Sequence, residues 1–344
     1  MPCRPETDSV TSEPEANGQQ AVPDPPPVAV IDNAPMAASR LAAGGLVAIP
    51  TETVYGLAAD ISDRSAVARI FEVKGRPSDH PLILHIADVE TARRFGTLDS
   101  RAEALAMLWP GPLTMIVPAT DLVPRDVTGG LDTVALRIPQ HPLTIEVLRA
   151  LNGAVAAPSA NRFGRVSPTT ADHVLADLGE LLDPARDAIL DGGPCPVGVE
   201  STIVDLTCDP PQILRPGGMP IALLDRLLGP VDGSHTVAAS GPARASGMLP
   251  SHYAPEREVM LIEIADRETL AARALIIDRA DDPVEAARHL YDDLRRADID
   301  TGRQLDEPII VVQPPEDGGL GSAVRDRLRK AAAPRELPST SRDG

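Results

Sequence analysis

Short aliphatic runs alternate with helical patterns between Met36 and Leu228, and this alternation constrains the fold more than any other feature. The runs typical of buried strands are Leu46–Ile49, Leu82–Ile86, Met115–Val117, Val134–Ile138, Val155–Ala157 and Ile203–Leu206. Helical patterns lie between several of them, at Ser65–Val73, Arg101–Leu108, Pro142–Leu151, Pro168–Leu178 and Pro220–Leu228. Because alternating strands and helices pack as layers, the pattern predicts an α/β domain with a mixed sheet.

A second, smaller α/β unit is predicted after a linker. The stretch Gly229–Ser251 is rich in Gly, Ser, Ala and Pro and has no periodicity, which is typical of a linker. Beyond it, strands are expected at Val259–Ile264, near Ala274–Ile277 and at Ile309–Val312, and helices at Pro283–Arg296 and Leu320–Ala332. We therefore expect a disordered tail over 1–30, a first domain over 31–228, a linker or lid over 229–258, a second domain over 259–333 and a disordered tail over 334–344.

The composition argues against several classes of protein. The chain has 344 residues and 43% apolar content, enough for two domains with their own cores. A net charge of −18 disfavours a general nucleic-acid coat, because most of the surface repels phosphate. Cys3, Cys195 and Cys208 are too scattered for a disulfide framework or a structural metal site, which indicates a reducing, cytoplasmic compartment. We expect neither a membrane span nor a secretory signal.

Polar residues follow several predicted strands, where ligands of open α/β sheets gather. The segment Thr51–Thr53 follows the first strand, either as ligand-binding groups or as a polar turn whose threonines bond to local backbone. Lys74–Arg76 is either an ordinary helix C-terminus or a polyphosphate clamp, with lysine as point charge and arginine as planar fork. Ala157–Asn161 again exposes small polar groups after a strand. Ser167 is expected to cap a helix that starts at Pro168, and a helix N-terminus also attracts anions.

Two strand residues and two further loop residues complete this set. His85 is most simply a core histidine, whereas Arg137 lies in an apolar strand and needs an anionic partner if it is buried. Ser201 and Arg215 lie beside predicted strands. The loops hold hydroxyls and cations but no cysteine nucleophile or metal cage. This combination suits binding of a triphosphate, with a second anionic substrate near Arg137.

The same segments resemble the YrdC-like family of threonylcarbamoyl-AMP synthases. The matching motifs are Pro-Thr-Glu-Thr-Val-Tyr-Gly-Leu from Pro50, Lys-Gly-Arg-Pro from Lys74, Pro-Leu-Ile-Leu-His-Ile from Pro81, Trp-Pro-Gly-Pro-Leu-Thr from Trp109, Val-Ala-Leu-Arg-Ile-Pro, Ala-Pro-Ser-Ala-Asn, Glu-Ser-Thr-Ile-Val-Asp and Leu-Arg-Pro-Gly. Ser246–Pro255 is similar to the linker of longer, two-domain members, and Gly318–Gly321 is similar to part of their C-terminal domain. The resemblance implies a twisted mixed sheet with a large open cavity, plus the smaller α/β domain.

The resemblance implies a synthase that joins L-threonine, bicarbonate and ATP into threonylcarbamoyl-AMP and releases pyrophosphate. The product would serve the threonylcarbamoyladenosine modification of transfer RNA through a downstream transferase machinery. Mg²⁺ would accompany ATP, no structural metal is expected, and transfer RNA would be bound weakly or indirectly.

The family's site residues carry over to positions in this chain. The catalytic signature falls on Lys74, Arg76, Ser159 and Asn161. The ATP-binding positions match Arg76, His80, Thr133, Ser159, Ser167, Arg215 and, from the linker, Tyr253. The threonine-binding positions match Thr53, His85, Arg137, Ala157 and Ser201. Position 80 is commonly Asn in this family, and histidine adds a titration near neutral pH. Tyr253 is expected either as a lid over the nucleotide or as an anchor between domains.

Two other classes of function remain as alternatives. A carbamoyltransferase of the hydrogenase-maturation type carries a related domain together with zinc-finger CxxC pairs, which this sequence lacks. A binding module for double-stranded RNA would need a basic concave face, and the net charge of −18 weighs against it.

Overall fold

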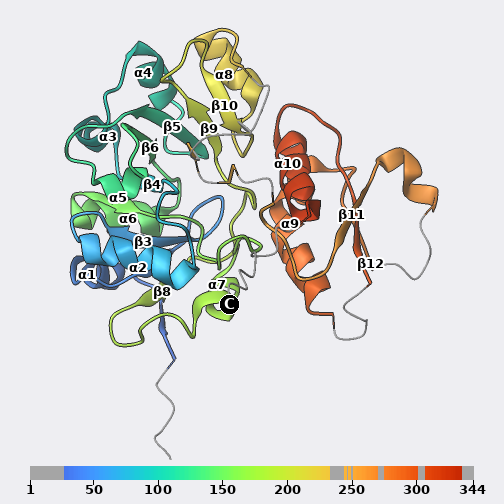
Figure 1. The fold of residues 1–344 in the computed structure, drawn as a ribbon, viewed down its shortest axis with the longest axis horizontal. Coiled ribbons are helices and arrows are strands. Elements are labelled where there is room, and N and C mark those ends of the chain that lie inside the picture. Colours follow the sequence, from blue (N-terminus) through green and yellow to red (C-terminus); the bar gives the residue numbers. More distant parts are fainter. Residues whose placement is uncertain are drawn as a thin grey trace, which may run out of the picture.

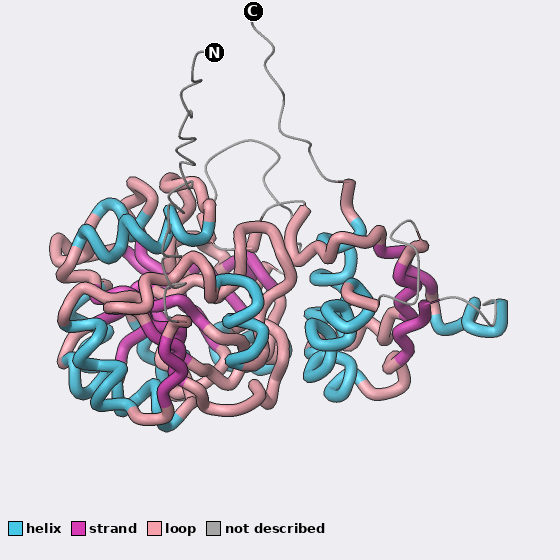
Figure 2. Tube along the Cα trace, turned by 90° about the horizontal axis from the view of Figure 1, so that it is seen from below, coloured by secondary structure: helices cyan, strands magenta, loops and turns pink. Residues whose placement is uncertain are grey.

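The computed structural model describes residues 27–232, 244–245, 247–248, 251–269, 275–300 and 307–334. The predicted tails over 1–26 and 335–344, and linker residues 233–243, lie outside the described residues. The described chain forms two bodies side by side, each with its own sheet (Figures 1 and 2). We propose that these bodies are the two domains expected from the sequence, with the start of the first extended to include Ala29.

The first body is built on a mixed sheet in the order β1-β8-β2-β3-β7-β4-β6-β5-β9-β10. Its strands are β1 Ala29–Ile31, β2 Val47–Ile49, β3 Gly56–Asp60, β4 Ile83–Ile86, β5 Leu113–Pro118, β6 Thr133–Arg137, β7 Ala154–Ala156, β8 Ala188–Leu190, β9 Thr202–Asp205 and β10 Gln212–Arg215. Parallel pairs such as β4 with β6 adjoin antiparallel pairs such as β4 with β7, which confirms the predicted mixed α/β fold.

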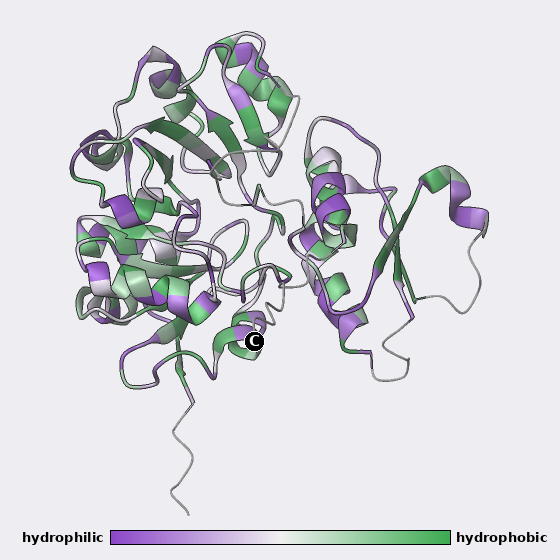
Figure 3. Ribbon diagram, viewed as in Figure 1, coloured by the Kyte–Doolittle hydropathy of each residue, from purple (hydrophilic) through white to green (hydrophobic). Residues whose placement is uncertain are grey.

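Helices cover this sheet on the outside (Figure 2). They are α1 Ala34–Ala42, α2 Arg64–Lys74, α3 Val89–Phe95, α4 Ser100–Ala106, α5 Arg125–Thr128, α6 Pro142–Leu151, α7 Ala171–Leu178 and α8 Ile221–Leu228. The strands are hydrophobic along most of their length, whereas the helices carry polar residues as well (Figure 3). Each helix buries its apolar stripe against the sheet, and burial of aliphatic side chains such as Leu57, Leu84 and Leu136 forms the core.

The second body is a small three-stranded parallel sheet with two main helices. Its elements are β11 Val259–Ile262, the 3₁₀ helix η1 Ile264–Thr269, β12 Leu275–Asp278, α9 Pro283–Asp298, β13 Ile309–Val312 and α10 Leu320–Ala332. The strand order is β11-β13-β12, as predicted for a smaller α/β domain. Helices α9 and α10 lie between this sheet and the first body (Figures 1 and 2). The helices, and not the second sheet, therefore face the first domain.

Two sequence predictions need correction. Strand β1 begins at Ala29, inside the segment expected to be a tail, because Ala29–Ile31 pairs in parallel with β8. Helix α7 begins at Ala171 rather than Pro168, and its N-cap is Thr170, whose side chain accepts from His173 N. None of the described helices is long and apolar enough to cross a membrane.

Candidate active site

A narrow, partly enclosed cavity lies where loops of the first sheet meet the linker. It is lined by Thr51, Val54, Gly56, Ile83, His85, Arg137, Ala157, Pro158, Ser159, Glu200, Ser201, Arg215, His252 and Tyr253. His252 and Tyr253 of the linker form part of its wall, which makes it more enclosed than the open cavity that the resemblance implies. Most of its polar lining comes from strands or from segments that directly precede or follow them.

Strand register brings His85 and Arg137 together. In the parallel pair of β4 with β6, His85 lies opposite Arg137, so both side chains project from the same face of the sheet. Burial, and then the Arg137 charge, lower the pKa of His85 to about 3, which keeps the imidazole neutral. Arg137 Nη2 lies 2.8 Å from Glu52 Oε1, and Gln140 N donates to Glu52 Oε2. Glu52 is therefore the anionic partner that a buried Arg137 requires.

Thr51 forms the polar turn that the sequence allowed as an alternative. Its Oγ1 donates to Val54 O and accepts from Thr53 N and Val54 N. The Thr53 hydroxyl lies 2.8 Å from Thr51 Oγ1 and does not itself line the cavity. The turn thus satisfies local backbone groups while it presents Thr51 to the cavity.

Lys74 and Arg76 flank the end of α2, where Gly75 adopts a left-handed conformation with φ 64°. Lys74 Nζ donates to Ser159 O at 2.6 Å and also to Asn161 O. Burial, and then the neighbouring Arg76, lower the pKa of Lys74 well below its usual value. Arg76 Nη2 donates to Pro81 O, and its Nε is buried without a hydrogen-bond partner among the described residues. In this structure the lysine therefore braces the loop of the signature serine and asparagine.

Ser201 and Arg215 form another polar side of the cavity. Ser201 Oγ lies 2.7 Å from Thr114 Oγ1, and Arg215 donates to it from Nη2 at 3.1 Å. Arg215 Nε also donates to Ser201 O. Gly217 permits this close approach, because a Cβ there would lie 2.3 Å from the backbone of Glu200. The guanidinium is thus fixed at the cavity by its contacts with β9 and the residues before it.

Ser167 does not cap a helix, which corrects the sequence prediction. Its Oγ donates to Glu200 Oε1 at 2.7 Å, and Pro168 O accepts from Tyr55 N, so this segment is tied to neighbouring loops before α7 begins. Glu200 is 5% exposed and also accepts from Arg327 and Tyr291 of the second domain. No local sequence pattern indicates these partners, because Arg327 lies 127 residues from Glu200 in the chain.

The linker side of the cavity depends on Tyr253, which is 2% exposed and adopts a left-handed φ of 62°. Its ring stacks on Tyr291 with centroids 5.8 Å apart, and the Arg327 guanidinium lies 5.3 Å from the ring centroid. His252 Nδ1 accepts from Tyr253 N at 2.9 Å, which fixes the two side chains relative to each other. Tyr253 therefore lines the cavity and contacts the second domain at the same time.

The structure divides the predicted site residues into two groups. Those that line the cavity are His85, Arg137, Ala157, Ser159, Ser201, Arg215 and Tyr253. Those outside its lining are Thr53, Lys74, Arg76, His80, Asn161, Thr133 and Ser167. Thr133 is the first residue of β6 and Arg137 is the last, so the two lie at opposite ends of the strand. His80 lies edge-on to Phe163, and burial followed by the Arg76 charge lowers its pKa.

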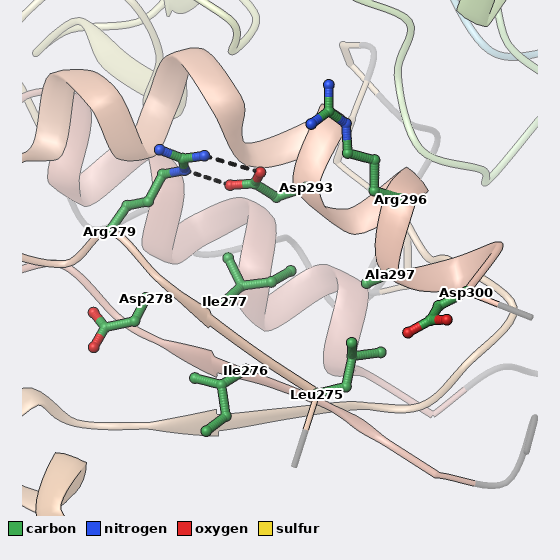
Figure 4. Close-up of a pocket in the computed structure, with 9 residues that line it drawn as sticks. All are labelled: Leu275, Ile276, Ile277, Asp278, Arg279, Asp293, Arg296, Ala297 and Asp300. Atoms are coloured by element: carbon green, nitrogen blue, oxygen red, sulfur yellow. Dashed lines mark hydrogen bonds and ion pairs between the residues drawn. The ribbon is translucent and has the colours of Figure 1, made fainter. Parts of the chain in front are cut away.

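A larger and more open hollow lies in the second domain between β12 and the end of α9 (Figure 4). Several of its charged side chains pair within that domain: Arg279 with Asp293, Asp278 with Arg267, and Arg296 with Asp292. The narrower cavity of the first domain instead gathers polar groups from many loops, and it is the better candidate for an active site. Among the described residues, no group of three or more His, Cys, Asp or Glu is arranged to hold a metal ion.

Comparisons with known proteins show which family the chain resembles. Residues 39–217 match the Sua5_yciO_yrdC family model, described as "Telomere recombination", and residues 221–333 match the C-terminal domain of threonylcarbamoyl-AMP synthase. The chain is 40% identical to the threonylcarbamoyl-AMP synthase of Pyrococcus abyssi over 326 residues, which cover 86% of this chain and 93% of that protein. It is 37% identical to the enzyme of the same name from Bacillus subtilis, covering 88% and 93% respectively. The crystal structure of P. abyssi Sua5 complexed with L-threonine has a TM-score of 0.78 at 38% identity, covering 89% of this chain and 97% of that one.

The environment of Glu200 predicts how stability depends on pH. Burial alone would raise its pKa, but the charges of Arg327 and then Arg215 lower it to about 2. A carboxylate with a depressed pKa stabilises the fold above its unfolded pKa, and this contribution is lost as the pH falls toward the folded value. The unfolding free energy of the wild type should therefore exceed that of Glu200→Gln most above about pH 5. The difference in unfolding free energy between the two proteins should decrease by roughly 3 kcal/mol as the pH falls toward 2.

Urea unfolding of both proteins at successive pH values measures this difference. The buried His85, with a pKa lowered to about 3, titrates in both proteins and cancels in the comparison. His252 does not cancel fully, because the Glu200 charge raises its pKa, so the measured difference includes the interaction between these two side chains. Parallel stability curves across the acid range would contradict a charged, arginine-paired Glu200.

Proposed function

The chain belongs to the Sua5/YrdC family and is a two-domain threonylcarbamoyl-AMP synthase, and we propose that the cavity between Arg137 and Arg215 is its active site. The observation that carries this proposal is the grouping of His85, Arg137, Ser201 and Arg215 around one cavity. The enzyme uses ATP, and the proposals below concern where its substrates bind and which residues act on them.

We propose that threonine binds at the His85–Arg137 side of the cavity. Arg137 Nε and Nη2 are buried and make no hydrogen bond among the described residues, although Nη2 is ion-paired with Glu52. A guanidinium with donors of this kind suits the carboxylate of an amino acid. The neutral His85, the backbone of Ala157 and the hydroxyls of Thr53 and Ser201 would surround the rest of the substrate.

We propose that the ATP phosphates bind on the side of Arg215, Ser159 and Arg76. The neutral threonine amine attacks the carbon of CO₂ and releases a proton, or attacks that of bicarbonate and releases water, and in either case forms a carbamate. A carbamate oxygen then attacks the α-phosphorus, and the bond to pyrophosphate breaks. Arg76 and Arg215 stabilise the negative charge that builds on the phosphoryl and leaving oxygens. Lys74 supports them by holding the backbone of Ser159.

The remaining carried-over residues have supporting places in this proposal. Mg²⁺ accompanies ATP, since divalent cations neutralise a transferring phosphoryl group. Asn161, whose Oδ1 is buried without a hydrogen-bond partner among the described residues, belongs to the loop that Lys74 holds. His80, Thr133 and Ser167 are proposed as outer contacts of the nucleotide.

Tyr253 is proposed as a lid over the bound nucleotide, which would protect the carbamate from water. Its place in the cavity wall supports the lid, and its stacking on Tyr291 supports the alternative of a domain anchor. Limited proteolysis of the linker separates the two. Protection of residues 229–251 by ATP and threonine together supports the lid, and equal cleavage with and without both ligands supports the anchor.

We propose a cytoplasmic enzyme that passes its product to separate transferase machinery. The net charge of −18 supports weak or indirect binding of transfer RNA. Tight binding of unmodified transfer RNA in a filter assay at moderate salt would contradict this part of the proposal.

The activity is tested by incubation of the protein with ATP, threonine and labelled bicarbonate. Pyrophosphate release should require both threonine and bicarbonate, and the label should appear in a threonylcarbamoyl adenylate. Threonine-independent hydrolysis of ATP to ADP would instead indicate a different ATP-using reaction.

Lys74→Ala and Arg76→Ala should each lower kcat/KM for pyrophosphate release by at least about a hundredfold, the scale of losing one preorganised donor. Lys74→Arg should also be impaired, because a planar fork cannot replace a compact ammonium between two carbonyls. Arg64→Ala, on the same helix but paired at the surface with Asp126, is the control and should retain activity. Full activity in Lys74→Arg would show that the site does not need an ammonium there.

A further inference from the structure

Glu200 is a buried carboxylate in the cavity wall, and two of its partners come from the second domain. Arg327 Nε donates to Glu200 Oε2 at 2.7 Å, and the Tyr291 hydroxyl lies 3.0 and 2.9 Å from the two carboxylate oxygens. The Arg327 side chain is 1% exposed and that of Glu200 is 7% exposed. Ser167 supplies the contact from the first domain. A charge pair buried this deeply requires both members, because either one alone would be left uncompensated.

The second domain is held closely enough to keep these groups in place. Gly198, two residues before Glu200, has φ 82°, and a Cβ there would lie 2.3 Å from Ala287 O of α9. The loop that carries Glu200 therefore packs directly on the α9 backbone. Arg327 Nη1 also donates to Pro216 O, in the turn that follows Arg215. Helix α10 thus contacts both segments that supply charge to the cavity.

Glu200 and Arg215 line the same cavity with opposite charges. A carboxylate beside a phosphate site repels the ligand and attracts the arginine that should bind it. Arg327 pairs with both Glu200 and Asp326, and Asp326 has a second cation in Lys330 at 2.9 Å. The two carboxylates are thus matched by two cations of α10, so Arg215 is not needed to balance Glu200. The charged or titratable groups that influence or contact Glu200 are Arg327, Arg215, Tyr291, Tyr253 and His252.

We propose that Arg327 and Tyr291 are positioning residues of the synthase: they hold Glu200 away from Arg215, so that Arg215 binds the ATP phosphates. The second domain therefore contributes to the active site of the first through the contacts of Arg327 and Tyr291 with Glu200. These two residues do not contact substrate. This inference rests on the proposed function, because it takes ATP as the ligand of Arg215.

The test measures steady-state pyrophosphate release by full-length variants. Arg327→Met should raise KM for ATP by about tenfold or more, while kcat and KM for threonine change by less than about threefold. Arg325→Met is the matched control, since Arg325 lies on the same helix and pairs with Glu263 inside the second domain. The control should keep the wild-type KM for ATP.

Removal of both charges gives the sharpest result. Glu200→Gln with Arg327→Met should recover most of the ATP affinity lost in Arg327→Met alone, because no unbalanced carboxylate remains to compete for Arg215. A purely structural role for Arg327 predicts instead that kcat, KM for threonine and KM for ATP all worsen together in Arg327→Met and recover together in the double variant. That outcome, or a wild-type KM for ATP in folded Arg327→Met, would overturn the proposal.

If Arg327→Met does not fold, Tyr291→Phe tests the proposed positioning of Glu200 instead. This variant removes only the hydroxyl at Glu200 and keeps the ring that stacks on Tyr253. It should raise KM for ATP by about threefold with kcat unchanged, and an unchanged KM would count against the proposal. A wild type that makes no pyrophosphate with threonine present would instead reject the proposed function itself.

Discussion

The ion pair between Glu200 and Arg327 is the interaction on which the site depends. Two charges removed from water this completely stabilise a structure only when each satisfies the other, and here they belong to different domains. This explains why α9 and α10, and not the second sheet, face the first domain (Figure 1). It also gives the second domain a role in a reaction whose substrate-binding residues are proposed to lie in the first domain and the linker. Separation of the domains would leave a bare carboxylate in the cavity wall.

An acidic protein can bind an anionic nucleotide when its cations are local and its buried carboxylates are neutralised. Arg137 is balanced by Glu52 on one side of the cavity, and Glu200 is balanced by Arg327 on another. These pairs neutralise both buried carboxylates, so the net charge of the chain does not determine the local charge around Arg215. The buried His85 stays neutral, which avoids a further change of charge beside the proposed threonine site within the physiological pH range.

Much of the fold was predictable because buried strands in this chain are aliphatic runs. The predicted strand at Val134–Ile138, for example, matches β6 closely. Strand β3 was missed because Gly56–Asp60 contains alanine, glycine and aspartate instead of β-branched residues, and its burial comes from the strands on both sides. The cap assigned to Ser167 was wrong because its hydroxyl bonds to Glu200, a contact between distant loops that no local pattern encodes.

The predicted site residues show the same difference between contacts that follow from local sequence patterns and contacts between distant segments. Residues within strands, such as His85 and Arg137, lie together through strand register, whereas the Glu200–Arg327 contact could be found only once the two domains were placed. The role of this contact can be examined in a crystal structure of the full chain with threonine and a non-hydrolysable ATP analogue. In that complex Arg327 should remain paired with Glu200 while Arg215 contacts a phosphate oxygen. A Glu200 that has turned to Arg215, or phosphates bound away from Arg215, would contradict this prediction.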